Sequence, residues 1–294
     1  FGSSHLAQAF VGNRQWQQPP GTSAPAAMAA PGLRRLYDQD WVANGCIGPF
    51  PAGSNTDDTV GTYVTNYIIT AVGLAAAVAV VCNRSSSRKY KILSANFFVW
   101  TALGYGVAGV LHQLFREDEL NRIHRAWWVV SYVGTLLGIL ALDLLVNDLL
   151  VARFPRLSGC KWPLLVTSLL GAAFMIVSNI LEDSLLLTGL YLTAILCYAL
   201  VVFALWSDWV KVVGVAFMIA GMIVQVALAP TCGPTAYFDC FKDCPLPSPA
   251  TFNHNALFHV FFFLGLGIVG AAMAVNPNTA ADKSQDTPQE TSEA

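Results

Sequence analysis

Four histidines are the side chains of this sequence best suited to bind a metal or transfer protons: His112, His124, His254 and His259. Neutral imidazole is the commonest metal ligand in proteins. A catalytic zinc takes three protein ligands and a water, and it lowers the pKa of that water toward neutrality, which makes the water a nucleophile. Such chemistry requires that the fold bring together histidines that lie far apart in the sequence.

The phase of a helix decides which of the polar residues near position 255 can act together. Asn255 and His259 are four positions apart, so they share one face of a helix. His254 and His259 are five positions apart, which separates them by about 140° around a helix axis. His254 can therefore join His259 only at the start of the helix, where Asn253 or Thr251 is a suitable N-cap.

The elements that hold these residues are predicted to be membrane-spanning helices. The chain has 294 residues, of which 55% are hydrophobic and 12% are charged, whereas a soluble domain carries about 25% charged residues. The net charge of −2 gives no basis for nucleic-acid binding. About 20 apolar residues cross the hydrocarbon core, and a helix satisfies its own backbone there. Seven stretches are suitable: 63–82, 93–114, 126–150, 163–181, 185–206, 209–229 and 255–275.

We therefore predict an all-α protein whose domain at 61–275 is a seven-transmembrane-helix bundle. Residues 1–60 are rich in Ala, Pro, Gln and Gly, and we expect an irregular segment outside the membrane. Residues 276–294 are polar and acidic, which favours a disordered tail. Only positions 182–184 separate the fourth and fifth stretches, so these should form a tight helical hairpin.

The lysines and arginines of the short loops predict which side of the membrane faces the cytosol. The side opposite the N-terminus holds eight of them, and the loops on the N-terminal side hold four. We therefore expect the N-terminus outside the cytosol or in a lumen, and the C-terminus in the cytosol. The residues are Arg84, Arg88, Lys89, Lys91, Arg153, Arg156, Lys161 and Lys211 on the cytosolic side, and Arg116, Arg122, Arg125 and Lys242 on the other.

This topology places the four histidines at the same membrane face. His112 ends the second stretch, His124 precedes the third, and His254 and His259 begin the seventh. Ionisable side chains inside a bundle usually mark a functional site. The alternative is that each histidine simply lies in the interfacial zone at a helix end.

Other polar and small residues within the stretches are expected to have structural roles. Asp143 and Asn147 are four apart, lie toward the predicted cytosolic side, and are predicted to cap or bridge helices there. Gly104, Gly106 and Gly109 permit close approach between helices.

Four cysteines lie on the face opposite the predicted cytosol: Cys46, Cys232, Cys240 and Cys244. If the orientation is right, that side is oxidising, so we predict two disulfides among them, in one of three connectivities. A loop of free thiols, or a metal knuckle built on Cys240 and Cys244, is the alternative.

Three short stretches carry a family resemblance: DTVGTYVTNYII at 58–69, AGVLHQLF at 108–115 and FNHNALFHVFFF at 252–263. In this order they resemble the CREST superfamily of seven-span membrane hydrolases, which includes the alkaline ceramidases, the progestin and adipoQ receptors and the Per1-type lipid-remodelling proteins. The resemblance extends over roughly residues 40–275. It implies a zinc amidase that acts on a membrane lipid, with His112 and His259 as metal ligands.

The sequence departs from the family pattern at several positions. Ala108 stands where the family has Ser, and Asn255 stands where it has the first His of H-x-x-x-H. The family's acidic residue has no clean match, because the acidic run 117–119 comes early and His124 stands near the expected position. Either His254 or His124 therefore supplies a third ligand, or the site has lost its metal and the fold serves another role.

Two functions are consistent with these residues. The first is zinc-dependent hydrolysis of a membrane lipid amide or ester. Its expected residues are His112, His254 and His259 on the metal, His124 or an acid of 117–119 for proton transfer, and Asn255 as a donor to the oxyanion. The second is a non-catalytic receptor or scaffolding protein of the same fold with a degenerate metal site. An unrelated seven-span receptor or a transporter is a further alternative, and a retinal protein is disfavoured because the seventh stretch contains no Lys.

Overall fold

The computed structural model of the protein describes residues 59–84, 86–114, 122–182, 185–232, 243–249 and 251–275. Most of these residues are helical, and none of them is in a strand. The prediction of an all-α fold is confirmed. The predicted N-terminal segment, apart from its last two residues, and the predicted tail at 276–294 lie outside the described residues.

Seven helices are long and apolar enough to cross a membrane, as the sequence predicted. They are α3 (Val60–Cys82), α4 (Arg88–Leu114), α5 (Arg122–Arg153), α6 (Lys161–Glu182), α7 (Leu185–Leu205), α8 (Trp209–Cys232) and α9 (His254–Val275). The short 3-10 helix η1 (Pro155–Cys160) joins α5 to α6. The predicted short connection is confirmed, because only positions 183 and 184 separate α6 from α7, but α6 packs more on α5 than on α7.

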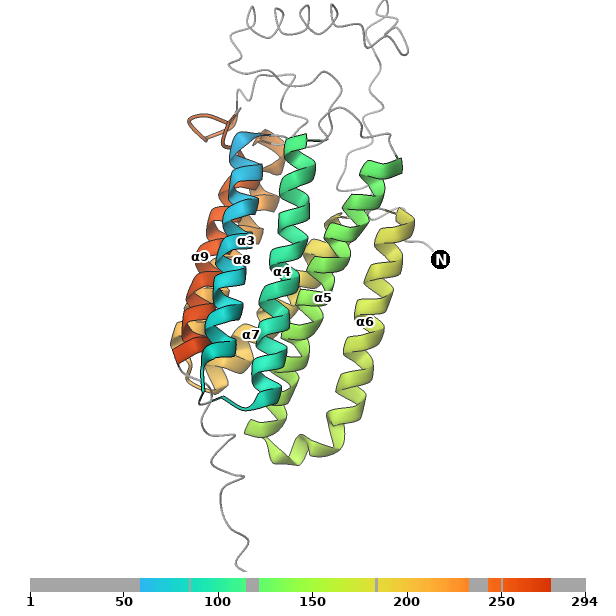
Figure 1. Cartoon of the computed structure of the whole chain (residues 1–294), viewed down its shortest axis with the longest axis vertical. Helices are drawn as coiled ribbons and strands as arrows, with labels where there is room; N and C mark the ends of the chain where they lie inside the picture. Colours follow the sequence, from blue (N-terminus) through green and yellow to red (C-terminus); the bar gives the residue numbers. More distant parts are fainter. Residues whose placement is uncertain are drawn as a thin grey trace, which may run out of the picture.

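The helices form a bundle in which α6 lies at one edge (Figure 1). α4 packs between α3 and α5, α9 packs between α3 and α8, and α7 contacts α5 and α8. α6 leans mainly on α5. Large side chains fill the core between the helices, and Phe98, Leu142, Leu196 and Phe262 are all at most 2% exposed.

Glycines set how closely the helices approach. α4 presents Gly104 to α5, where an added Cβ would lie 2.5 Å from Thr135 Oγ1. The carbonyl of Gly104 also accepts a 2.8 Å hydrogen bond from Ser131 Oγ. On another face α4 presents Gly109 to α3, where a Cβ would lie 3.1 Å from the Cβ of Asn66. The predicted role of the α4 glycines in close helix packing is confirmed.

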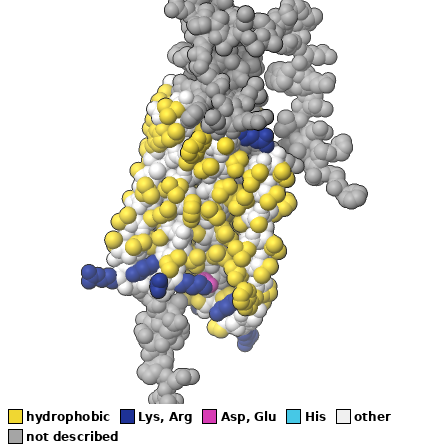
Figure 2. Space-filling view, turned by 45° about the vertical axis from the view of Figure 1, so that its right-hand side comes forward, with side chains coloured by type: hydrophobic (Ala, Val, Ile, Leu, Met, Phe, Trp, Pro, Cys, Tyr) yellow, Lys and Arg dark blue, Asp and Glu magenta, His cyan; other side chains and the backbone are white. Residues whose placement is uncertain are grey.

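The exposed surface divides into an apolar band and a basic end. Figure 2 shows lysine and arginine gathered at the end of the bundle where α4 and α6 begin and α5 ends. Above that end the surface is mainly hydrophobic, with large side chains such as Leu170, Phe174 and Val226 about two-thirds exposed. A band of this kind is what lipid tails require of a bundle surface.

Lys211 differs from the other basic residues that the sequence places at the cytosolic side, which are exposed or partly exposed. It lies inside α8 and is fully buried. Its Nζ is 2.5 Å from Asp208 Oδ2 and lies 5.9 Å from the ring centre of Tyr90 and 5.6 Å from that of Phe203. The ion pair and the two rings offset the cost of taking the ammonium out of water.

Two glycines of α9 provide a matched test of the close packing. A Cβ at Gly265 would lie 2.6 Å from Met218 Cγ in α8, whereas a Cβ at Gly267 would meet only Val72 Cγ1, at 3.5 Å. We expect Gly265→Ala to lower the free energy of unfolding by about 1–3 kcal/mol through overpacking. Gly267→Ala should be neutral or raise it by up to about 1 kcal/mol through helix propensity. Thermal unfolding of both variants in one detergent measures this, and equal effects would contradict it.

Candidate functional site

His259 lies in the second turn of α9 and connects this helix to α3. It is 4% exposed, and its Nδ1 is 3.0 Å from the hydroxyl oxygen of Thr65. The Thr65 hydroxyl is also 2.7 Å from the carbonyl oxygen of Gly61, to which it donates. Thr65 therefore accepts from His259, whose Nδ1 carries the hydrogen. The edge of the imidazole also meets Tyr105 of α4, with ring centres 5.5 Å apart.

His254 is the first residue of α9 and connects it to the end of α8. Its Nδ1 is 3.0 Å from the carbonyl oxygen of Cys232, and because a carbonyl only accepts, Nδ1 is the donor. Asn253 caps the helix, since its Oδ1 accepts from the backbone N–H groups of Asn255 and Ala256 at 3.0 and 3.1 Å. The predicted N-cap at Asn253 is confirmed, and it places His254 in the first turn, as expected.

Cys232 also forms a disulfide with Cys244, so the same end of α8 is tied covalently to the segment before α9. The prediction of a disulfide in this loop is therefore confirmed. Cys46 and Cys240 lie outside the described residues, so the second predicted disulfide stays a prediction.

His112 lies in the last turn of α4 and packs against α5. It is 7% exposed, and its ring meets the indole of Trp128 edge to face, with centres 5.1 Å apart. Position 124 lies in the first turn of α5, one turn before Trp128. The side chain of His124, like the acidic run 117–119, lies outside the described residues, so the predicted proton-transfer roles stay predictions.

The structure brings His112, His254 and His259 to one end of the bundle, as the topology predicted, but gives each a different neighbour. His259 contacts α3 and α4, His254 contacts α8, and His112 contacts α5. The described residues contain no group of three His, Cys, Asp or Glu side chains that could hold a metal ion. These donors by themselves do not complete a zinc site, so the zinc prediction stays a prediction. Asn255 is partly exposed, and its oxyanion role is likewise untested.

Asn66 is the most unusual polar residue near the histidines. It is 0% exposed, and neither its amide nitrogen nor its amide oxygen has a hydrogen-bond partner among the described residues. It follows Thr65 in α3 and faces Gly109, which lies one turn before His112 in α4. Leaving a buried amide without partners costs about 1–3 kcal/mol, so such a group is usually kept for a purpose. The sequence shows an Asn inside a membrane stretch. It does not show that Gly109 of another helix would pack closely against it.

A second polar cluster joins α5, α6 and α7 nearer the basic end. Asn147 donates to Ser168 Oγ at 3.0 Å and to Asp143 Oδ1 at 3.4 Å, and its Oδ1 accepts from Tyr198 OH at 2.7 Å. The predicted bridging role is confirmed for Asn147, which joins α5 to α6 and α7, whereas Asp143 bonds to Asn147 within α5.

Seven apolar helices long enough to cross a membrane, with buried polar clusters between them, define an α-helical multi-pass membrane protein. Within that class, a family model described as a family of unknown function (DUF6962) matches residues 61–275, and the chain belongs to this family. No curated protein and no solved structure matches the chain.

The hydrogen bond between α3 and α9 can be tested with two threonines. Thr65→Val keeps the side-chain volume but removes the partner of His259 Nδ1, so we expect the free energy of unfolding to fall by about 1–2 kcal/mol. Thr193→Val is the control, because among the described residues that hydroxyl bonds only the carbonyl of Gly189 in its own helix, and its loss should cost about 0.5 kcal/mol or less. Chemical or thermal unfolding in detergent gives both values. Equal losses of unfolding free energy in the two variants would show that the contact between Thr65 and His259 adds nothing to stability.

Proposed function

We propose that the chain is a non-catalytic seven-helix membrane protein, a receptor or scaffold with a CREST-like bundle, whose histidines join helix ends. The observation that carries the proposal is that the three buried imidazoles contact different helices. His259 bonds to Thr65, His254 bonds to the Cys232 carbonyl, and His112 packs on Trp128. Each contact stabilises a different helix pair at the same membrane face.

Two departures from the CREST pattern support the same proposal. Ala108 has no hydroxyl to offer where the family has Ser, and it is buried in α4. Asn255 replaces an imidazole with an amide, which is a poorer ligand for zinc. A bundle that keeps the fold but loses two site residues fits a role in binding or assembly.

The proposed orientation puts the basic end in the cytosol and the histidine end outside it or in a lumen. The exposed Lys and Arg residues where α4 and α6 begin support this through the positive-inside rule. The Cys232–Cys244 disulfide at the opposite end supports it independently, because disulfides persist on the oxidising side of a membrane.

Zinc-dependent hydrolysis of a membrane lipid amide or ester is the second candidate function. His254 donates its Nδ1–H to a carbonyl and His259 is held through Nδ1, and zinc-ligating histidines are commonly oriented through the second ring nitrogen in this way. The buried, unpartnered amide of Asn66 also favours a ligand in this region. This function requires a further ligand whose side chain the structure does not describe, for which His124, one turn before Trp128 in sequence, is the candidate.

Zinc content separates the two functions. For a non-catalytic protein we expect far less than one zinc per chain in detergent-purified wild type, even after zinc is supplied. His112→Ala and His259→Ala should lower the melting temperature without changing the metal content, and His5→Ala is the control. About one zinc per chain, lost in His112→Ala and His259→Ala but kept in His5→Ala, would reject the non-catalytic function. A lipid-hydrolysis screen would then follow.

A further inference from the structure

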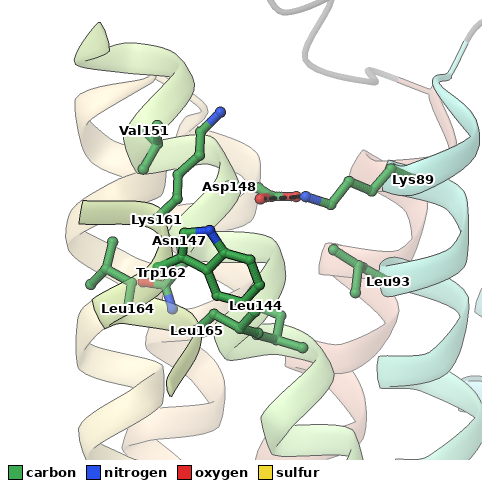
Figure 3. Close-up of a pocket in the computed structure, with 10 residues that line it drawn as sticks. All are labelled: Lys89, Leu93, Leu144, Asn147, Asp148, Val151, Lys161, Trp162, Leu164 and Leu165. Carbon is green, nitrogen blue, oxygen red and sulfur yellow. Dashed lines mark hydrogen bonds and ion pairs between the residues drawn. The ribbon is translucent and has the colours of Figure 1, made fainter. Parts of the chain in front are cut away.

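A cavity of about 390 Å³ opens between α4, α5 and α6 at the basic end of the bundle. Figure 3 shows Lys89 of α4 and Asp148 of α5 pointing toward each other, while Lys161 of α6, which also lines the cavity, points away from this pair. Its walls include Leu93 of α4 and Trp162 of α6. The cavity is far from the histidines. It lies at the start of α4, whereas His112 lies near the end of α4, and His254 and His259 lie at the start of α9.

The charges of the cavity favour an anion. Lys89 Nζ lies 2.6 Å from Asp148 Oδ1 and 2.5 Å from Oδ2, so this carboxylate neutralises one of the two lysines. Lys161 is exposed and makes no ion pair within the described part of the chain. The Lys89 side chain is itself 70% exposed, so it can contact a second anion while it stays beside Asp148. The three groups together leave a surplus of one positive charge.

Apart from Asn147, the rest of the cavity wall is apolar. Leu144 of α5 and Leu165 of α6 lie beside Leu93 on the side of the cavity toward the membrane interior. The indole of Trp162 is 74% exposed, which is typical of a Trp at the headgroup level of a bilayer. A free anion makes no use of such a wall, whereas a lipid presents a phosphate and an acyl chain together.

We propose that this cavity binds the headgroup of an anionic membrane phospholipid. Lys161 and Lys89 contact the phosphate, and the first part of an acyl chain follows Leu93 and Leu165 toward the membrane interior. Asp148 holds Lys89 at the cavity and, by competing for it, limits the affinity. Basic pockets between transmembrane helices on the cytosolic side are suited to anionic headgroups for these physical reasons.

Lipid binding to the purified full chain in detergent tests the proposal. Phosphatidylglycerol is titrated and complexes are counted by native mass spectrometry, with phosphatidylcholine and inorganic phosphate as separate titrations. We expect phosphatidylglycerol to bind at least tenfold more tightly than phosphatidylcholine, and millimolar phosphate not to displace it. Lys161→Ala and Lys89→Ala should each weaken binding about fivefold, because one lysine near a headgroup contributes about 1 kcal/mol.

The carboxylate and an arginine outside the cavity wall provide the controls. Asp148→Asn releases Lys89 from its ion pair and should strengthen phosphatidylglycerol binding severalfold, the opposite of the lysine variants. Arg156→Ala removes an exposed charge at the same end, in η1 and outside the cavity wall, and should change binding less than twofold. Equal weakening by Arg156→Ala and Lys161→Ala would show diffuse surface charge and overturn the proposal. Displacement of the lipid by phosphate, or equal binding of phosphatidylcholine, would also overturn it. Melting temperatures without lipid exclude misfolding.

Discussion

The interior of a bilayer offers a backbone no hydrogen-bond partners, and the described structure depends on this constraint. A helix pairs its own backbone N–H and C=O groups except at its two ends, so other polar groups are needed where helices begin and end. At the face where α9 begins, Asn253 accepts from two backbone amides of the first turn, and His254 donates to the carbonyl of Cys232 at the end of α8. Several helices end near this membrane face, and this explains part of the clustering of polar residues there.

Lipid tails are as apolar as leucine, so burial alone does not hold membrane helices together. Small residues and interhelical hydrogen bonds do, as at Gly104, whose carbonyl accepts from Ser131. α6 has no glycine packed so closely, because a Cβ at its Gly171 would meet the Tyr191 hydroxyl oxygen only at ordinary contact distance, 3.5 Å. It is joined to α5 by the bond from Asn147 to Ser168, and the cavity at the basic end opens beside this loosely packed helix.

The sequence predicted the features that depend on local pattern, and missed those that depend on how helices rotate against one another. Apolar length predicted the seven helices, and residue type predicted the cap at Asn253. Which neighbour each histidine contacts depends on helix rotation and on partners far away in the chain, so the contact of His112 with Trp128 had no local signal. Lys211 was missed for a related reason: its ion-pair partner Asp208 is only three residues away, but the aromatic rings of Tyr90 and Phe203 that cover it come from α4 and α7.

The energies involved distinguish a structural from a functional metal. A neutral hydrogen bond such as that of His259 to Thr65 contributes about 1 kcal/mol, whereas a structural zinc contributes on the order of 10 kcal/mol. Near the start of α9 the helix ends are already joined by the Cys232–Cys244 disulfide, the Asn253 cap and the two histidine contacts. These bonds are made by protein atoms alone, so none of them depends on a metal, and each would remain if a zinc bound near His112 and His259 were removed.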